Sequence, residues 1–307
     1  MKSRRGCLSW GYKEIENMRH IPVLLNEVVG ALQLKPGMNV IDCTLGDAGH
    51  AEKILEKIGP DGKLLGIDAD TEAVLRAKQY LYNFGKQVIF VRDNFVNLKK
   101  IVAENNFNPV DGILLDLGWS SPQFEERGRG FSFLKEDEPI DMRYGLQQSP
   151  ARRSGGDFGL RTAGELLNEL GAEELERIFR EYGEEKLSKE IAEAIVVERA
   201  EKRIETVGDL VEIILIVYRN KLKSEKEIPW VGGLHPATKV FQALRIAVNQ
   251  ELESLDQAIR EALDFLNPGA RIVIISFHSL EDRIVKTRFR EASRERRLVL
   301  VTKKPIT

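Results

Sequence analysis

Residues 39–50 read NVIDCTLGDAGH, an apolar run followed by a polar segment that contains two glycines. Residues 39–43 have the composition of a short buried strand, and residues 51–58 have the apolar spacing of a helix. Gly46 and Gly49 lie between them and permit a ligand to approach the backbone closely. A strand, a glycine-containing turn and a helix in this order are typical of a nucleotide-binding α/β domain.

The alternation of strand and helix continues on both sides of this segment. Further strands are predicted at 63–67, 88–91, 112–115 and 271–277, and further helices at 22–32, 71–84, 96–104 and 255–266. Single helices between successive strands indicate crossover connections, and these predict a parallel, doubly wound α/β sheet.

The middle of the chain has a different pattern. Residues 160–222 show helical periodicity and no strand pattern, which predicts a helical domain inserted into the sheet domain. One apolar stripe follows the i, i+3, i+4, i+7 spacing: Leu175, Ile178, Phe179 and Tyr182. We expect a disordered extension over 1–17, a sheet domain formed by 18–148 and 230–307, and the inserted all-helical domain over 149–229.

The composition of the 307 residues excludes several classes of protein. Apolar residues make up 42% and charged residues 31%, which is typical of soluble globular proteins. No apolar run approaches the ~20 residues that cross a bilayer, so no membrane partner is expected. Two cysteines make neither a disulfide framework nor a zinc site, which favours a cytoplasmic protein. The net charge of −2 does not by itself indicate nucleic acid as a partner.

A carboxylate ends the predicted strand at 63–67. Asp68 lies eighteen residues after His50, where an acidic side chain accepts hydrogen bonds from both ribose hydroxyls of an adenosine. Asp42 and Asp116 end two other predicted strands in the same way. Ligands of open parallel sheets bind at this edge, so the three carboxylates predict an adenosine site.

The turn after the first strand disfavours a dinucleotide as the ligand. It reads G-x-x-G instead of G-x-G-x-x-G, and Asp47 within it would repel a pyrophosphate. The turn also lacks the lysine of a Walker phosphate-binding loop. A cationic ligand without phosphates fits better, and S-adenosylmethionine is such a ligand. The alternative is a Rossmann-like domain that binds no nucleotide.

Residues 116–124, DLGWSSPQF, follow an apolar run. Within them SPQF (121–124) resembles the Asp/Asn/Ser-Pro-Pro-aromatic turn of enzymes that methylate exocyclic amines of bases, with Gln in place of the second Pro. The Ser121 hydroxyl and the Pro122 carbonyl would accept hydrogen bonds from the amino group, so that the nitrogen lone pair can point at the methyl carbon. Positioning carries most of such a transfer. The alternative is a plain Ser-Pro turn with core aromatics.

Longer stretches of the chain, from Met18 onward, resemble a single family. The matching segments are HIPVLLNEVV (20–29), DCTLGDAGH (42–50), DGILLDLGWSSPQF (111–124), RGFSF (129–133), PIDMR (139–143), TAGELLNEL (162–170), HPATKVFQALRIAVNQEL (235–252) and SFHSLEDRIVK (276–286). Together they resemble the bacterial 16S ribosomal RNA (cytosine-N4)-methyltransferase family. The resemblance implies a class I S-adenosylmethionine-dependent methyltransferase with a Rossmann-like doubly wound sheet and an inserted all-helical domain.

The resemblance also implies a reaction and a set of cofactor contacts. The reaction is methyl transfer from S-adenosylmethionine to N4 of a cytidine in the decoding centre of 16S rRNA in the small ribosomal subunit. Ser121 and Pro122 are the implied catalytic residues. Ala48 stands where the family often has glycine. The implied cofactor-binding residues are Ala48, Gly49, His50, Asp68, Phe95, Asp116 and Gln123. Gly46, which lies in the same glycine-containing turn, is added to this set.

Several residues of the matching segments are candidates for contact with RNA. Arg129 and Phe131 combine a cation with an aromatic ring, which suits single-stranded RNA. His235 and His278 lack metal partners at ligand spacing, so we expect no metal. For every candidate the alternative is a structural role in a packed loop or on a solvated face. The full set is Trp119, Arg129, Phe131, His235, Arg245, Asn249 and His278, with Phe124 as a second stacking residue.

The residues leave other functions open. A methyltransferase of this kind that acts on DNA or on a protein amine fits the Ser-Pro turn equally well. A non-catalytic adenosine-binding factor for ribosome assembly is a third alternative. The oligomeric state, a homodimer included, also stays open. The family usually continues beyond Thr307 with a last strand, so we expect that strand to be missing and 298–302 to form an exposed edge strand.

Overall fold

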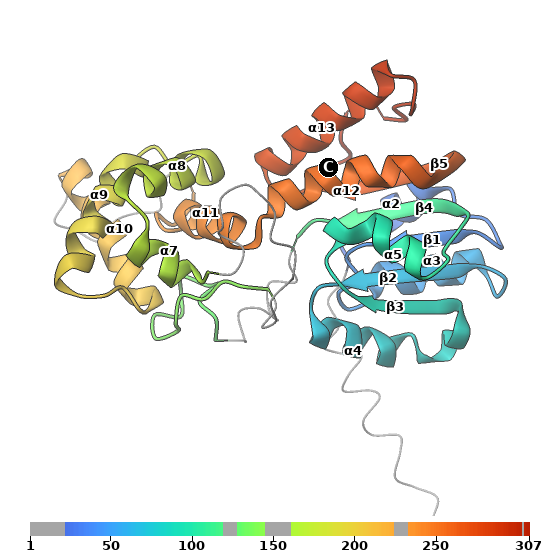
Figure 1. Ribbon diagram of the computed structural model, residues 1–307, viewed down its shortest axis with the longest axis horizontal. Helices are drawn as coiled ribbons and strands as arrows, with labels where there is room; N and C mark the ends of the chain where they lie inside the picture. Colours follow the sequence, from blue (N-terminus) through green and yellow to red (C-terminus); the bar gives the residue numbers. More distant parts are fainter. Residues whose placement is uncertain (1–21, 119–127, 145–160, 224–232, 303) are drawn as a thin grey trace, which may run out of the picture. The chain divides into compact units, whose positions relative to one another are not determined.

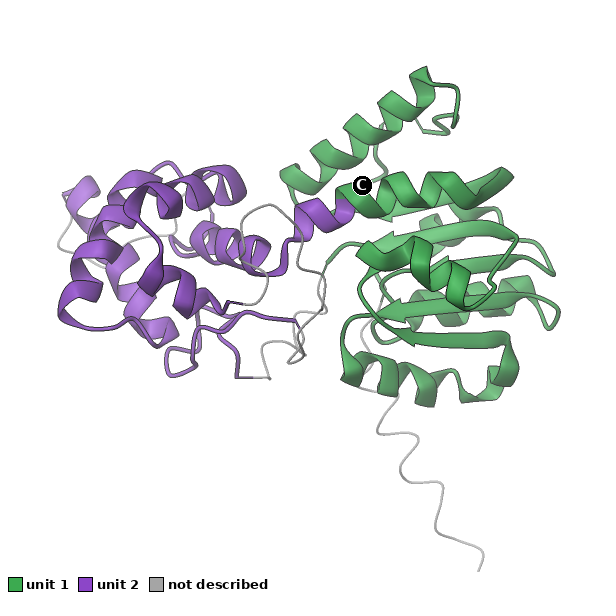
Figure 2. Cartoon of the chain, in the orientation of Figure 1, with its two compact units in different colours: residues 1–118, 256–307 green, residues 119–255 purple. Residues whose placement is uncertain are grey.

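The structure, a computed structural model, describes residues 22–118, 128–144, 161–223, 233–302 and 304–307. The chain divides into two units (Figure 2): residues 1–118 and 256–307 form the first, and residues 119–255 form the second. The inserted domain expected over 149–229 lies within the second unit, and its limits stay a prediction. The extension expected over 1–17 lies outside the described residues.

A parallel sheet forms the centre of the first unit (Figure 1). Its order is β3-β2-β1-β4-β5, and all neighbouring strands are parallel. Leu64 and Leu65 point to opposite faces of the sheet and are both fully buried, so both faces are covered. The doubly wound α/β fold predicted from the sequence is confirmed. The strands are β1 (Asn39–Asp42), β2 (Lys63–Asp68), β3 (Val88–Arg92), β4 (Val110–Asp116) and β5 (Leu266–Ile275).

Helices connect these strands and supply the apolar layers on the sheet. Within α3, Ile54, Leu55 and Ile58 are buried on one side. Asp70 begins α4 by accepting hydrogen bonds from the amides of Glu72 and Ala73. The helices that hold residues of this unit are α2 (Leu25–Leu32), α3 (Gly49–Ile58), α4 (Thr71–Tyr80), α5 (Leu98–Glu104), α12 (Glu251–Phe265) and α13 (Ser279–Arg294), with the short helices η1 (Tyr82–Gln87) and η2 (Phe95–Asn97).

Strand β5 begins earlier than the sequence indicated and includes the Asn-Pro-Gly turn that was expected to precede it. Leu266 pairs with Val110, and Arg271 pairs with Gly112, so residues 267–270 bulge out of the ladder. The predicted Asn-Pro-Gly turn at 267–269 is therefore a bulge within a longer strand and does not precede it.

The segment 298–302, expected as an edge strand, is not a strand in the structure. Val299 is 84% exposed and Val301 is 63% exposed. A strand requires a hydrogen-bonded neighbour, and no described strand pairs with this segment. The prediction for 298–302 was wrong, because an apolar, β-branched composition does not supply a partner.

Residues 161–222 of the second unit are helical, as their periodicity predicted, whereas residues 128–144 form turns and bends. The capping box at Thr162 and Glu165 is present, since each side chain bonds the other residue's amide. Leu175 and Phe179 of the predicted stripe are fully buried. Among the described helices, none has both the length and the apolar character that a bilayer-spanning segment needs. The helices are α7 (Ala163–Glu169), α8 (Ala172–Gly183), α9 (Ser188–Glu201), α10 (Val207–Leu222) and α11 (Thr238–Asn249).

One loop of the second unit contains a position that only glycine fits. Gly130 has a φ of +73°, and a Cβ there would lie 2.4 Å from the Pro139 carbonyl oxygen. The Gly130 amide donates to a Glu138 carboxylate oxygen at 2.9 Å. Because Gly130 lies between Arg129 and Phe131, its backbone fixes the positions of two candidate RNA contacts.

We predict that Gly130→Ala lowers the free energy of unfolding by about 3 kcal/mol. The left-handed conformation costs about 1–2 kcal/mol for an alanine, and the forced backbone shift adds roughly 1–3 kcal/mol. Gly233→Ala is the matched control in the same unit, because Gly233 has a φ of +84° and a Cβ there would meet no described atom within 4 Å. Urea unfolding followed by circular dichroism measures both. Equal losses for the two variants would contradict the prediction.

Candidate functional site

Three carboxylates lie at one edge of the sheet. Asp42 ends β1, Asp68 ends β2 and Asp116 ends β4. Asp42 lies opposite Gly66 in the β1–β2 pair and opposite Leu114 in the β1–β4 pair, so each neighbouring carboxylate is two residues further along its strand. The edge therefore carries three acidic side chains on three adjacent strands, as the sequence predicted.

The turn after β1 is hydrogen-bonded to both neighbouring strands. The Leu45 amide donates to the Ile67 carbonyl at 2.9 Å, and the Gly46 amide donates to the Asp68 carboxylate at 2.8 Å. On the other side, the Asp116 amide donates to the Thr44 hydroxyl at 2.7 Å. Thr44 was missed in the sequence analysis, although a hydroxyl directly after a strand is a signal for such a bond.

The start of α3 is unusually constrained. Ala48 has a φ of +59° and is fully buried, a conformation in which an alanine is strained and a glycine is not. A Cβ on Gly49 would lie 2.2 Å from the Pro22 ring. The structure thus explains why glycine suits this turn, and it shows that the chain adopts a left-handed conformation at 48 with alanine there.

His50 lies between this turn and the end of β4. Its Nε2 is 3.0 Å from the Val23 carbonyl oxygen, and its Nδ1 is 3.5 Å from an Asp116 carboxylate oxygen. The imidazole is buried at 6% exposure. The structure therefore brings His50 and Asp116, two of the predicted cofactor-binding residues, into direct contact.

Burial changes the proton affinity of the three carboxylates. It raises the pKa of Asp42 to about 7, and the charges of Asp116 and Asp68 contribute to the rise. Burial raises the pKa of Asp68 to about 6. Burial, followed by the charge of Glu281, raises the pKa of Asp116 to about 6. The edge is thus an acidic, poorly solvated region whose negative charge is incompletely compensated.

Asp47, which the sequence suggested as a negative charge facing the ligand, is paired with an arginine. Its carboxylate is 7% exposed and accepts a hydrogen bond from the Arg76 guanidinium at 2.8 Å. This ion pair neutralises Asp47, so the expectation that Asp47 repels a pyrophosphate was wrong. The preference for a cationic ligand instead comes from the carboxylates at the strand ends.

The residues at this edge fit S-adenosylmethionine. Within the described part of the chain, Asp116 Oδ1 is buried and has no hydrogen-bond partner, which is expected of an atom that a ligand completes. Asp68 faces the turn that holds Gly46, where a ribose would be bound in such folds. Phe95 begins η2, directly after β3, at the same end of the sheet. A sulfonium cation near Asp116 would also offset the charge of these carboxylates.

The candidate RNA contacts of the second unit are held by internal hydrogen bonds. Arg129 donates to the carbonyl oxygens of Arg143 and Tyr144 at 3.1 and 3.2 Å. Asn249 donates to the Met142 carbonyl at 2.8 Å and accepts from the Tyr144 amide at 3.0 Å. These bonds fasten the loop that contains Arg129 to the end of α11.

Three further candidates have partners within the second unit. Arg245 makes two hydrogen bonds of 3.0 Å to the Glu251 carboxylate. The Phe131 ring stacks on Tyr144 with centroids 6.2 Å apart. His235 stacks on Phe133 at 4.5 Å, and burial lowers the pKa of His235. RNA contact by these residues stays a prediction.

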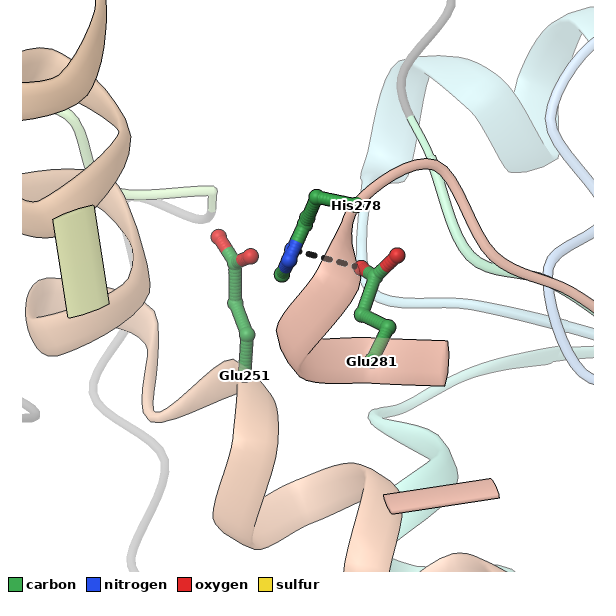
Figure 3. Close-up of side chains that lie close together, drawn as sticks. All are labelled: Glu251, His278 and Glu281. Atoms are coloured by element: carbon green, nitrogen blue, oxygen red, sulfur yellow. Dashed lines mark ion pairs between the residues drawn. The ribbon is translucent and has the colours of Figure 1, made fainter. Parts of the chain in front are cut away.

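His278 precedes α13 in the first unit. Its Nε2 lies 3.2 Å from Glu281 Oε1, and the two form an ion pair when the imidazole is protonated (Figure 3). Glu281 was missed in the sequence analysis, although an acidic residue in the first turn of a helix is a common signal. The predictions of no metal and of a homodimer stay predictions. Trp119, Ser121, Pro122, Gln123 and Phe124 lie outside the described residues.

We predict that Asp42→Asn becomes more stable than the wild type as pH rises. The folded pKa of Asp42 is about 7, above the unfolded value of about 3.9, so the wild type loses stability from about pH 4 to about pH 7. The asparagine keeps an oxygen for the Thr44 amide and removes the charge. The difference should reach roughly 2–4 kcal/mol at pH 8, measured by urea unfolding at pH 4 and pH 8. Asp61→Asn, at an exposed carboxylate, is the control; a pH-independent difference for Asp42→Asn would contradict the prediction.

Comparison with known proteins assigns the chain to a family. Several proteins called "Ribosomal RNA small subunit methyltransferase H" match it. The one from Clostridium botulinum (strain Loch Maree / Type A3) is 42% identical over 94% of this chain and 91% of the relative. The one from Geobacter sp. (strain M21) is 44% identical over 95% of this chain and 93% of the relative. One from Symbiobacterium thermophilum is 44% identical over 88% of this chain and 79% of the relative. Residues 17–307 match the MraW methylase family, which confirms the predicted methyltransferase and its cofactor, S-adenosylmethionine. The chain belongs to the MraW methylase family.

Proposed function

We propose that this protein methylates the small-subunit ribosomal RNA, at the exocyclic N4 of a cytidine in the decoding centre. The relatives that match over 88–95% of the chain carry the name of a ribosomal RNA small subunit methyltransferase. The cytidine N4 is supported by the sequence SPQF at 121–124, whose residue types suit an exocyclic amine.

The observation that carries the proposal is the acidic edge of the sheet. Asp68 would accept hydrogen bonds from the ribose hydroxyls of the cofactor, while its other contact, with the Gly46 amide, holds the turn. Asp116 would lie near the positive end of the ligand, with its unpartnered oxygen available. When bound, S-adenosylmethionine supplies an electrophilic methyl group at this edge.

The acceptor side of the reaction requires a nitrogen whose lone pair is free. The amino lone pair of cytosine is conjugated with the ring, which makes the nitrogen a poor nucleophile. Acceptors at Ser121 and Pro122 would hold the two amino hydrogens and favour a pyramidal nitrogen. The chain would then have to position the base, exclude water and let one amino proton leave, while the cofactor would give up its methyl group from sulfur and depart as the neutral thioether.

The function is tested by methyl transfer from tritiated S-adenosylmethionine. Unmethylated small ribosomal subunits, free 16S rRNA, DNA and total protein are offered separately, and labelled nucleosides are identified by mass spectrometry. N4-methylcytidine from the small subunit supports the proposal. Label in DNA or protein alone would favour a different amine, and cofactor binding without any transfer would favour a non-catalytic assembly factor.

Two substitutions should separate chemistry from cofactor binding. Ser121→Ala is expected to lower kcat about 100-fold with an unchanged Kd for the cofactor, because it misplaces the amine. Asp68→Asn is expected to raise the cofactor Kd about 10-fold or more, since a charged hydrogen-bond acceptor is lost. Ser120→Ala is the neighbouring control for the serine. Isothermal titration with S-adenosylhomocysteine and single-turnover assays give the two quantities. If Ser121→Ala weakens cofactor binding as much as it slows transfer, the role of Ser121 is wrong.

A further inference from the structure

An exposed aromatic ring lies beside the last described residue before the predicted acceptor turn. Phe277 follows β5 and is 53% exposed, although it is a large apolar side chain. Its ring occupies the space over Gly118, because a Cβ on Gly118 would lie 2.3 Å from Phe277 Cε2. One side of the ring is therefore in contact with the backbone at the end of β4, and the rest of it faces solvent.

Strand register explains why these two residues meet. Asp116 pairs with Ile275 in the parallel β4–β5 ladder, and the Leu117 amide donates to the Ile275 carbonyl at 3.0 Å. Gly118 and Phe277 are each two residues beyond that pair. Phe277 thus lies at the carboxyl edge of the sheet, two residues beyond the end of β5, whose last residue pairs with Asp116. Along the chain, Gly118 precedes the sequence SPQF by only a few residues.

A buried carboxylate holds Phe277 in this place. Glu281 Oε2 accepts a hydrogen bond from the Phe277 amide at 2.9 Å, and Glu281 is only 6% exposed. Burying a carboxylate is unfavourable unless hydrogen bonds or charges compensate it, and here the Phe277 amide and the His278 imidazole lie beside its two oxygens. The charge of Glu281 also contributes to the raised pKa of Asp116.

We propose that the exposed side of Phe277 is the stacking platform for the pyrimidine of the acceptor nucleotide, and that Glu281 positions it. The inference rests on the proposed function, because the partner that it assigns to the ring is the base of the methyl acceptor. Enzymes that modify a base take it out of its stack and hold it against aromatic side chains. A glycine at 118 allows the ring to approach the strand end closely and leaves its other side free for a base.

The test compares variants that keep or lose the aromatic ring. Phe277→Leu retains an apolar side chain over Gly118 but cannot stack, and should lower kcat/KM for the small subunit about 5- to 100-fold, mostly through KM. Phe277→Trp should keep most of the activity. The Kd for S-adenosylhomocysteine should stay unchanged in both. Tyr82→Leu, which removes an aromatic ring with 79% exposure from η1, is the matched control and should behave as the wild type.

A double-mutant cycle tests whether Gly118 acts through the ring. Gly118→Ala forces the Phe277 ring to move and should reduce kcat/KM in the wild-type background. In the Phe277→Leu background the same change should have a much smaller effect, because the ring is already absent. Equal effects in both backgrounds would mean that Gly118 acts by another route.

The role of Glu281 is tested by a conservative pair. Glu281→Gln keeps an oxygen for the Phe277 amide and should retain the KM for RNA, while Glu281→Ala should raise it. Because Glu281→Gln removes a charge that raises the pKa of Asp116, the acid limb of the pH profile of kcat/KM should move to lower pH.

The outcomes distinguish the platform from the proposed function. If the wild type yields N4-methylcytidine and Phe277→Leu is fully active, the platform is wrong and the proposed function stands. If Phe277→Leu weakens cofactor binding instead, the ring belongs to the cofactor site and the platform is again wrong. If the wild type yields no N4-methylcytidine, the proposed function itself fails.

Discussion

The hydrogen bond from the Gly46 amide to the Asp68 carboxylate is the contact on which the cofactor edge depends. It joins the turn after β1 to the end of β2, and the Thr44–Asp116 bond joins the same turn to β4. The turn is thus held on both sides, and Ala48, the residue that precedes the first turn of α3, has a left-handed conformation. The positions of the strand ends therefore determine the shape of the cofactor turn.

The same edge is unfavourable for the folded protein in the absence of a ligand. Asp42, Asp68 and Asp116 are poorly solvated, and their raised pKa values show that their charged forms are disfavoured. A cation bound near Asp116 would favour the charged forms of these carboxylates, because it would compensate part of their negative charge. A methyl donor with a sulfonium group is both the chemically suitable ligand and the electrostatically suitable one.

The second unit organises its candidate RNA contacts through one loop and one helix. Asn249 and Arg129 both bond the backbone near Tyr144, and Phe131 stacks on its ring. Side chains that are fixed in this way lose little freedom when a ligand binds, which favours affinity. A rigid loop on a packed helix, such as α11, is a common way to present binding residues.

The sequence alone determined the alternating fold, because helix and strand periodicity are local properties, and it placed Asp42, Asp68 and Asp116 at strand ends. It also determined the helical character of the insertion. Only the tertiary structure decided which charges are compensated. Asp47 is paired with Arg76, twenty-nine residues away, whereas Asp116 has His50 beside one carboxylate oxygen and no hydrogen-bond partner among the described residues for the other. Register between β4 and β5 brings Phe277 onto Gly118, a contact across the sheet that no periodicity within either segment encodes.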